Sequence, residues 1–145
     1  MRRVVLAVAV VAVLAAGAAH AASAEARFRV IVNPLVKGNQ IPRASLSSIF
    51  LGRAPKWGDG SEVRPVDQSL RSPLRVSFSN DVHLQGLMEI QVYWQREIAK
   101  GRVPPPVKTS DEEVVEYVAS TPGAIGYVSP ETALPDTVRE VAVVN

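Results

Sequence analysis

The N-terminal segment decides how much of this chain is left to fold. A basic start is followed by an unbroken apolar run over residues 4–19 and then by the small residues of 21–24. A charged start, an apolar stretch and an A-x-A-like exit are the three parts of a secretory signal peptide. We therefore predict a signal peptide over residues 1–24, cleaved after Ala21 or Ala24, and an exported chain of about 121 to 124 residues.

An uncleaved membrane anchor is the alternative to cleavage. A spanning helix needs about 20 consecutive apolar residues, and this run is shorter and rich in Ala and Val rather than Leu. The sequence therefore favours a periplasmic or secreted protein with no membrane span after processing. A chain of this size can bury one apolar core without disulfides or metal.

Charge and cysteine content exclude several classes of function. The full chain has 16 Lys and Arg against 14 Asp and Glu, and removal of Arg2 and Arg3 with the signal leaves 14 of each. A near-neutral chain has no broad basic surface for nucleic acid. The absence of cysteine excludes disulfides, thiol catalysis and thiolate metal sites. With His83 as the one histidine left after processing, we predict no metal and no cofactor.

Short apolar runs between turn residues predict strands. The candidates are Phe28–Val32, Val63–Val66, Ala124–Ser129 and Val138–Val144. Pro65 restricts its run to an edge or an end of the sheet, because proline cannot donate to a ladder. The stretches 36–42 and 67–73 are predicted as loops.

Helices are predicted where apolar residues recur at spacings of three or four. Ser45 is expected to cap a first helix that Gly52 ends. A second, longer helix is expected to start within residues 79–81 and to stop at 100–101. It would bury a stripe made of Leu84, Leu87, Ile90, Trp94 and Ile98.

A third helix follows the stiff connector of prolines 104–106. Ser110 and Glu113 have the spacing of a capping box, and the helix is expected to end near residues 121–123. Strands and helices alternate along the chain, which predicts a single α/β domain.

The sequence lacks the residues that common catalytic sites require. A Ser–His–carboxylate triad would need His83, which no G-x-S-x-G elbow accompanies. The acidic residues 111–113 are better explained as stabilising a helix N-terminus. There is no phosphate-binding P-loop and no G-x-G-x-x-G. We therefore predict that the protein is not an enzyme and ask what it binds.

The loop from Asp67 to Arg75 is the candidate binding site. It carries Ser69, Arg71 and Ser72, which supply the hydroxyl and guanidinium donors that an oxyanion requires. An ordinary solvated turn is the alternative interpretation of the same residues.

Two segments resemble signature regions of a known family. Residues 46–57 (LSSIFLGRAPKW), followed by Gly58-Asp59, and residues 121–128 (TPGAIGYV) are similar to the phosphate-binding proteins of phosphate ABC transporters. These belong to the type II periplasmic-binding-protein-like superfamily. The resemblance implies a single lobe of that fold, with a mixed sheet and helices on both faces. It also implies a solute-binding protein for phosphate or a similar oxyanion, acting with an ABC transporter permease.

The anion loop departs from the family pattern. The resemblance assigns ligand binding to Gln68, Ser69, Arg71 and Ser72, with Gln68 where the family has an arginine. Pro73 lacks an N–H, so the family's backbone cradle cannot form. Arg71 or Arg75 is the expected substitute for the missing cation.

The chain also has the length of only one of the family's two lobes. One lobe offers half a cleft, so enclosing a ligand would require a protein partner or a homo-oligomer. The alternative function is an envelope interaction or sensor module that has lost its ligand site. In that case Trp57, Tyr93 and Trp94 become candidate contact residues if they are exposed.

Overall fold

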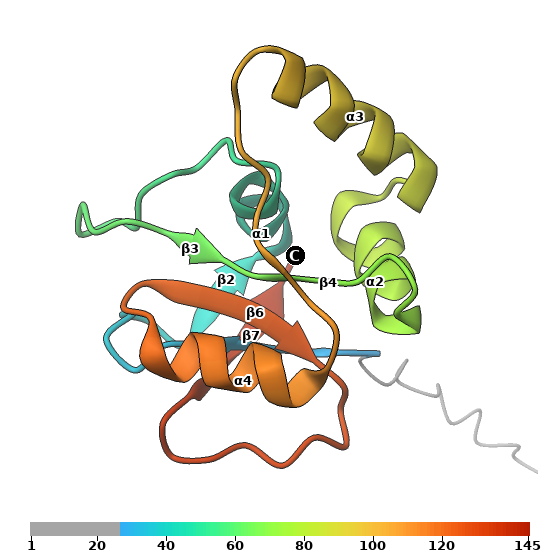
Figure 1. Cartoon of the computed structure of the whole chain (residues 1–145). Coiled ribbons are helices and arrows are strands. Elements are labelled where there is room, and N and C mark those ends of the chain that lie inside the picture. The colour runs from blue at the N-terminus through green and yellow to red at the C-terminus, as the bar shows by residue number, and fades with distance from the viewer. Residues whose placement is uncertain (1–26) are drawn as a thin grey trace, which may run out of the picture.

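The computed structural model describes residues 27–145, so the predicted signal peptide lies outside the described residues. Its centre is a five-stranded sheet (Figure 1) in the order β2-β7-β1-β6-β3. These strands are β1 (Arg29–Val32), β2 (Gln40–Pro42), β3 (Arg64–Pro65), β6 (Ala124–Val128) and β7 (Arg139–Val144). The β1 strand is antiparallel to β6 and β7, whereas the β2–β7 and β3–β6 pairs are parallel. The sheet is mixed, as predicted, and Pro65 lies in an edge strand.

Helices cover both faces of this sheet. Alternate residues of β1 point to opposite faces, so the strand contributes to the core on each side. Val30 and Val32 join a cluster with helix α1 (Arg43–Phe50), whereas Ile31 joins a cluster with helix α4 (Asp111–Ser120). This arrangement confirms the predicted α/β architecture. Ser110 caps α4, as predicted, by accepting a hydrogen bond from the backbone N–H of Glu113.

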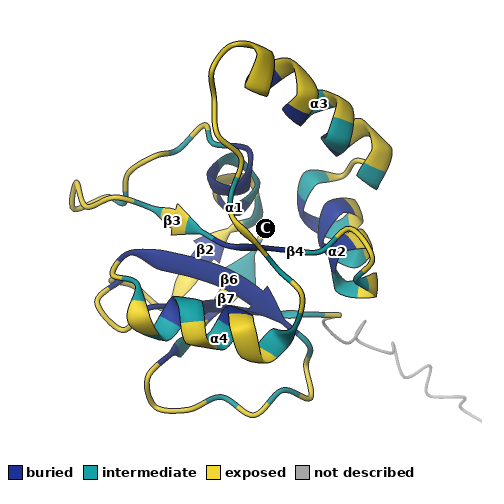
Figure 2. Ribbon diagram, viewed as in Figure 1, coloured by how far each residue is buried: buried dark blue, intermediate teal, exposed yellow. Residues whose placement is uncertain are grey.

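The β6 strand is buried along its whole length (Figure 2). A Cβ atom added at Gly126 would lie 2.8 Å from methyl groups of both Val66 and Val114. At Gly123, where φ is +81°, an added Cβ would collide with the backbone carbonyl of Glu62. Both glycines are therefore needed for the close approach of neighbouring segments.

Two predicted loops contain strand residues. Gln40–Pro42 forms β2 beside β7, and Asp67–Gln68 forms β4, which pairs in parallel with β5 (Val107–Lys108). Prolines 104–106 cannot donate backbone hydrogen bonds but can accept them, and the N–H of Asp67 donates to the Pro106 carbonyl. The partner strands of β2 and β4 are distant in the sequence, so no local residue pattern predicts these two strands.

The predicted long helix is wrong at its start. The chain instead forms α2 (Pro73–Phe78) and a π-helical turn, η1 (Ser79–His83), and then breaks before α3 (Leu87–Ala99). Leu84 adopts a left-handed conformation with φ of 55°. The N–H of Gly86 donates to the Glu89 carboxylate at 2.9 Å, which caps α3 at its own start.

The apolar stripe of this region is only partly core. Ile90 and Trp94 are buried against Leu51, but Leu84 and Ile98 are exposed. The predicted Ser45 cap is also wrong, since α1 begins at Arg43 and places Ser45 inside the helix. Pro42 precedes the helix and fixes the backbone angle there, so the start needs no hydroxyl cap.

A buried polar cluster connects β4, α2 and β6. Asp67 and Arg75 form an ion pair, and both are more than nine-tenths buried. The Tyr127 hydroxyl donates to Asp67 at 2.5 Å, and its ring stacks on Phe78 with centroids 3.9 Å apart. Burial raises the pKa of the Asp67 carboxyl, and the Arg75 guanidinium opposes that rise. Burial also raises the pKa of Tyr127, so its hydroxyl remains a donor.

His83 is half-buried between Ser47 and Phe78. Its Nδ1 atom lies 2.8 Å from the Ser47 hydroxyl, and its ring meets Phe78 edge-on. Burial lowers the pKa of His83 to about 4, with the guanidinium charges of Arg75 and Arg53 acting in the same direction. The histidine is thus a neutral packing residue, in η1 rather than in the first turn of a long helix.

We expect Asp67→Asn to destabilise the fold by about 3–5 kcal/mol, because it leaves the Arg75 charge buried without its counter-ion. Urea unfolding measures the change. Arg64→Ala is the matched control: its ion pair with Glu62 is exposed, so its loss should cost no more than about 1 kcal/mol. A loss for Asp67→Asn as small as the control's would contradict a structural role for this cluster.

We expect His83 to make stability depend on pH. Its folded pKa of about 4 lies below the ordinary value of 6.5, so the unfolded chain binds more protons between those values. Stability should therefore fall as pH drops from about 6.5 to about 4, by about 3 kcal/mol in all. The difference in unfolding free energy between wild type and His83→Gln, measured across this range, reports the effect. Parallel pH curves for the two proteins would overturn it.

Candidate anion-binding loop and cleft

The predicted site lies where two helix N-termini meet the end of β4. Ser72 caps α2 by accepting from the N–H of Leu74, and Ser110 caps α4. An open cleft of about 600 Å³ lies between them. Its hydroxyl-bearing lining residues are Ser72, Ser77, Thr109, Ser110 and Ser129. Helix N-termini carry partial positive charge, so this is where the fold would favour an anion.

Gln68 reaches the cleft, but its amide is fully engaged within the protein. Its nitrogen donates to the Asp111 carboxylate and to the Tyr127 carbonyl, both at 2.9 Å, and its side-chain oxygen accepts from Ser72 at 3.0 Å. The Ser72 hydroxyl in turn accepts from Leu74. These two predicted residues are brought together, where they organise the loop.

Ser69 and Arg71 take a different position. Neither lines the cleft, and Arg71 is exposed at the tip of the turn. The backbone N–H of Arg71 donates to the Ser69 hydroxyl at 3.3 Å. Arg75 cannot provide the expected substitute cation, because it is buried and paired with Asp67. Arg71 is therefore the cation of this loop that remains accessible.

The Asp111 carboxylate occupies the donors at the back of the cleft. It accepts from Gln68 on one oxygen, and from the Ser129 N–H at 3.0 Å and the Thr132 hydroxyl at 2.7 Å on the other. The sequence assigns Asp111 only to the start of a helix, and its partners 18 to 43 residues away give no local signal. The Asp111 carboxylate therefore already accepts the hydrogen bonds that a bound anion would need at the back of the cleft.

The charge of the cleft is mixed. Glu131 lies at its rim and accepts from the Ser129 hydroxyl at 2.5 Å, a contact that lowers the pKa of the Glu131 carboxyl. Arg27 also lines the cleft. A phosphate deep in the cleft would face the carboxylates of Asp111 and Glu131, so repulsion opposes it there.

Two negative findings apply to residues 27–145. No group of three or more His, Asp or Glu side chains is placed to hold a metal ion in this part of the chain. Among the helices of the described residues, none combines the length and apolar character needed to cross a membrane.

The fold is similar to solved structures of phosphate receptors. An ABC-type phosphate transport receptor from Vibrio cholerae matches with a TM-score of 0.63 and 17% identity, over 80% of this chain and 45% of that one. PstS from Borrelia burgdorferi matches with a TM-score of 0.65 and 18% identity, over 81% and 47%. A phosphate ABC transporter substrate-binding protein from Clostridium perfringens, solved with bound phosphate, matches with a TM-score of 0.62 and 19% identity. That match covers 80% of this chain and 44% of the other.

No family model and no curated protein matches the sequence. The chain spans less than half the length of these three structures, and the identities are below one fifth. A likeness of this kind shows fold and not ligand. Residues 27–145 therefore have an α/β fold similar to that of one part of these phosphate receptors.

Proposed function

We propose that this chain is an exported solute-binding protein that recognises a small oxyanion such as phosphate at an open surface. The observation that carries the proposal is its structural likeness to phosphate receptors, one of which was solved with bound phosphate. Export rests on the signal-peptide pattern of residues 1–24. In this proposal the protein is not an enzyme and works in the periplasm, or after secretion, with an ABC transporter permease or another envelope protein.

The loop geometry supports weak binding at the turn over residues 69–72. Arg71 supplies the accessible charge, and Ser69 supplies a hydroxyl beside it. Pro73 follows Ser72 at the start of α2 and has no N–H to add. A single described domain contributes one face only, so full enclosure of the ion requires a second copy or a partner protein.

We expect Arg71→Ala to weaken phosphate binding by about 1.5–3 kcal/mol, the scale of a hydrogen bond to a charged group. Calorimetric titration of the exported protein with phosphate and sulfate at two salt concentrations measures this. Arg96→Ala removes an exposed arginine on α3, far along the chain from the loop, and is the matched control. Unchanged affinity in Arg71→Ala would remove the loop assignment while leaving receptor function in place.

An interaction module without an oxyanion site is the second candidate. Two observations favour it: the Asp111 carboxylate already occupies the cleft donors, and an apolar stripe is exposed along α3. Met88 and Val92 lie four residues apart on α3 and are 71% and 41% exposed. Leu84, in the break before this helix, is 72% exposed. The aromatic contact residues suggested by the sequence fit this role less well. Trp94 is buried, and Tyr93 donates its hydroxyl to the Leu51 carbonyl.

The Asp111→Ala variant separates the two candidates. If the cleft is filled by its own carboxylate, removing Asp111 frees the donors of Gln68, Ser129 and Thr132. Phosphate should then raise the melting temperature of the variant but not of the wild type, by mass action on the folded state. Stabilisation of the wild type by phosphate supports the oxyanion receptor instead. No stabilisation of either protein would contradict the filled-cleft interpretation.

A further inference from the structure

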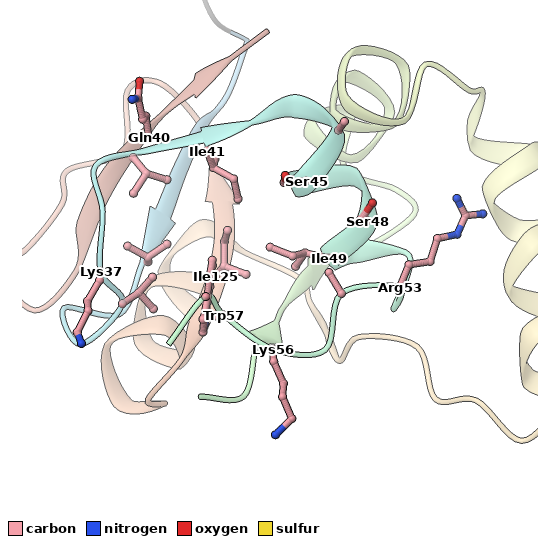
Figure 3. Close-up of a pocket in the computed structure, with 16 residues that line it drawn as sticks. Lys37, Gln40, Ile41, Ser45, Ser48, Ile49, Arg53, Lys56, Trp57 and Ile125 are labelled. Carbon is pink, nitrogen blue, oxygen red and sulfur yellow. The ribbon is translucent and has the colours of Figure 1, made fainter. Parts of the chain in front are cut away.

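A second cavity lies on the other side of the sheet from α4. It has a volume of about 580 Å³ and opens between α1, the sheet and the segment 53–58 (Figure 3). Cavities of this size hold small-molecule ligands. Its apolar lining residues include Val32, Val36, Ile41, Ile49, Ile125 and Val141. It is separate from the cleft at Gln68 and shares no lining residue with it.

One wall of this cavity is held rigidly by Trp57. The indole N–H donates to the Gly123 carbonyl at 3.0 Å, which fixes the ring beside Ile125. Gly123 itself has no room for a side chain. The wall is therefore formed before any ligand arrives, which lowers the entropic cost of binding.

The polar groups of the cavity are cationic or neutral. Lys37 and Lys56 extend at its lower edge in Figure 3, and Ser45 and Ser48 line the α1 side. Its lining contains no Asp or Glu. The lining residue Arg53 turns away, with its guanidinium carbon 5.0 Å from the centre of the Tyr93 ring.

The charge of Lys37 is only loosely engaged within the protein. Its ammonium lies 3.8 Å from the Asp59 carboxylate, and 82% of its side chain is exposed. Asp59 is held more tightly by Ser61, whose N–H and hydroxyl donate to it at 3.0 and 2.6 Å. An incoming anionic group at the mouth can therefore recruit Lys37 without breaking a buried contact.

We propose that this cavity binds a small amphiphilic anion, with an apolar aromatic or branched aliphatic body and one carboxylate or phosphate group. The apolar body would lie against Trp57, Ala44 and Ala54, which line the cavity and keep exposed apolar surface, and the charged group would lie at the mouth between Lys37 and Lys56. Inorganic phosphate fits poorly, because the apolar floor would remove its water without replacing those hydrogen bonds. The proposal does not depend on oxyanion binding at Arg71.

The test titrates ¹⁵N-labelled exported protein with 3-phenylpropionate, with 3-phenylpropanol as the uncharged analogue. We expect the carboxylate to shift the Trp57 indole N–H resonance, with an affinity about tenfold or more above that of the alcohol. The double variant Lys37→Glu/Lys56→Glu changes two exposed side chains and should weaken carboxylate binding by about tenfold or more. Arg96→Glu on α3 and Arg71→Ala in the loop are controls that should leave it unchanged.

Four results would overturn the proposal. They are no shift at Trp57, equal affinity for the carboxylate and the alcohol, equal binding by the double variant, and a loss of binding in Arg71→Ala. Phenyl phosphate in the same titration distinguishes the two anionic groups. Tighter binding of either one identifies the preferred head group within the proposed class.

Discussion

The contact between Asp67 and Arg75 is the constraint on which the candidate loop depends. Two opposite charges buried inside a small domain are tolerated only when each is paired and hydrogen-bonded. Asp67 meets this requirement with Arg75 and Tyr127, and Arg75 also donates to the Gln68 carbonyl. The cluster ties β4 to α2 and β6, so the turn between them has little freedom. This is why Gln68 faces inward while Arg71 is left at the surface.

The two motifs that resemble phosphate-binding proteins contact each other in the folded chain and contribute to its packing. Trp57 from the first motif donates to the carbonyl of Gly123 in the second, and Gly126 lets β6 approach Val66 and Val114. The resemblance therefore indicated the fold correctly, and the structural likeness to phosphate receptors agrees with it. Neither motif contributes a lining residue to the cleft at Gln68, although the Tyr127 carbonyl of the second motif accepts a hydrogen bond from the Gln68 amide.

Local patterns predicted the elements whose cause is local. The Ser110 cap, the buried β6 run and the edge position of Pro65 all follow from neighbouring residues. The features that the sequence did not predict depend on residues distant in the chain or on a helix cap that interrupts the apolar pattern. The β4 strand forms by pairing with β5, about 40 residues later in the chain, and the helix break at Leu84–Gly86 lies where Glu89 caps α3. Asp111 was missed as part of the candidate site because its three partners come together only in the folded chain.

We propose that this fold presents an accessible oxyanion site at the turn of residues 69–72. Amide chemical shifts of the exported protein, followed during titration with inorganic phosphate, test it most directly. We expect saturable shifts at the backbone amides of Leu70, Arg71 and Ser72, with no change at the Trp57 indole of the separate cavity. Phosphate shifts centred on Trp57, or no saturable shift at the turn, would contradict it.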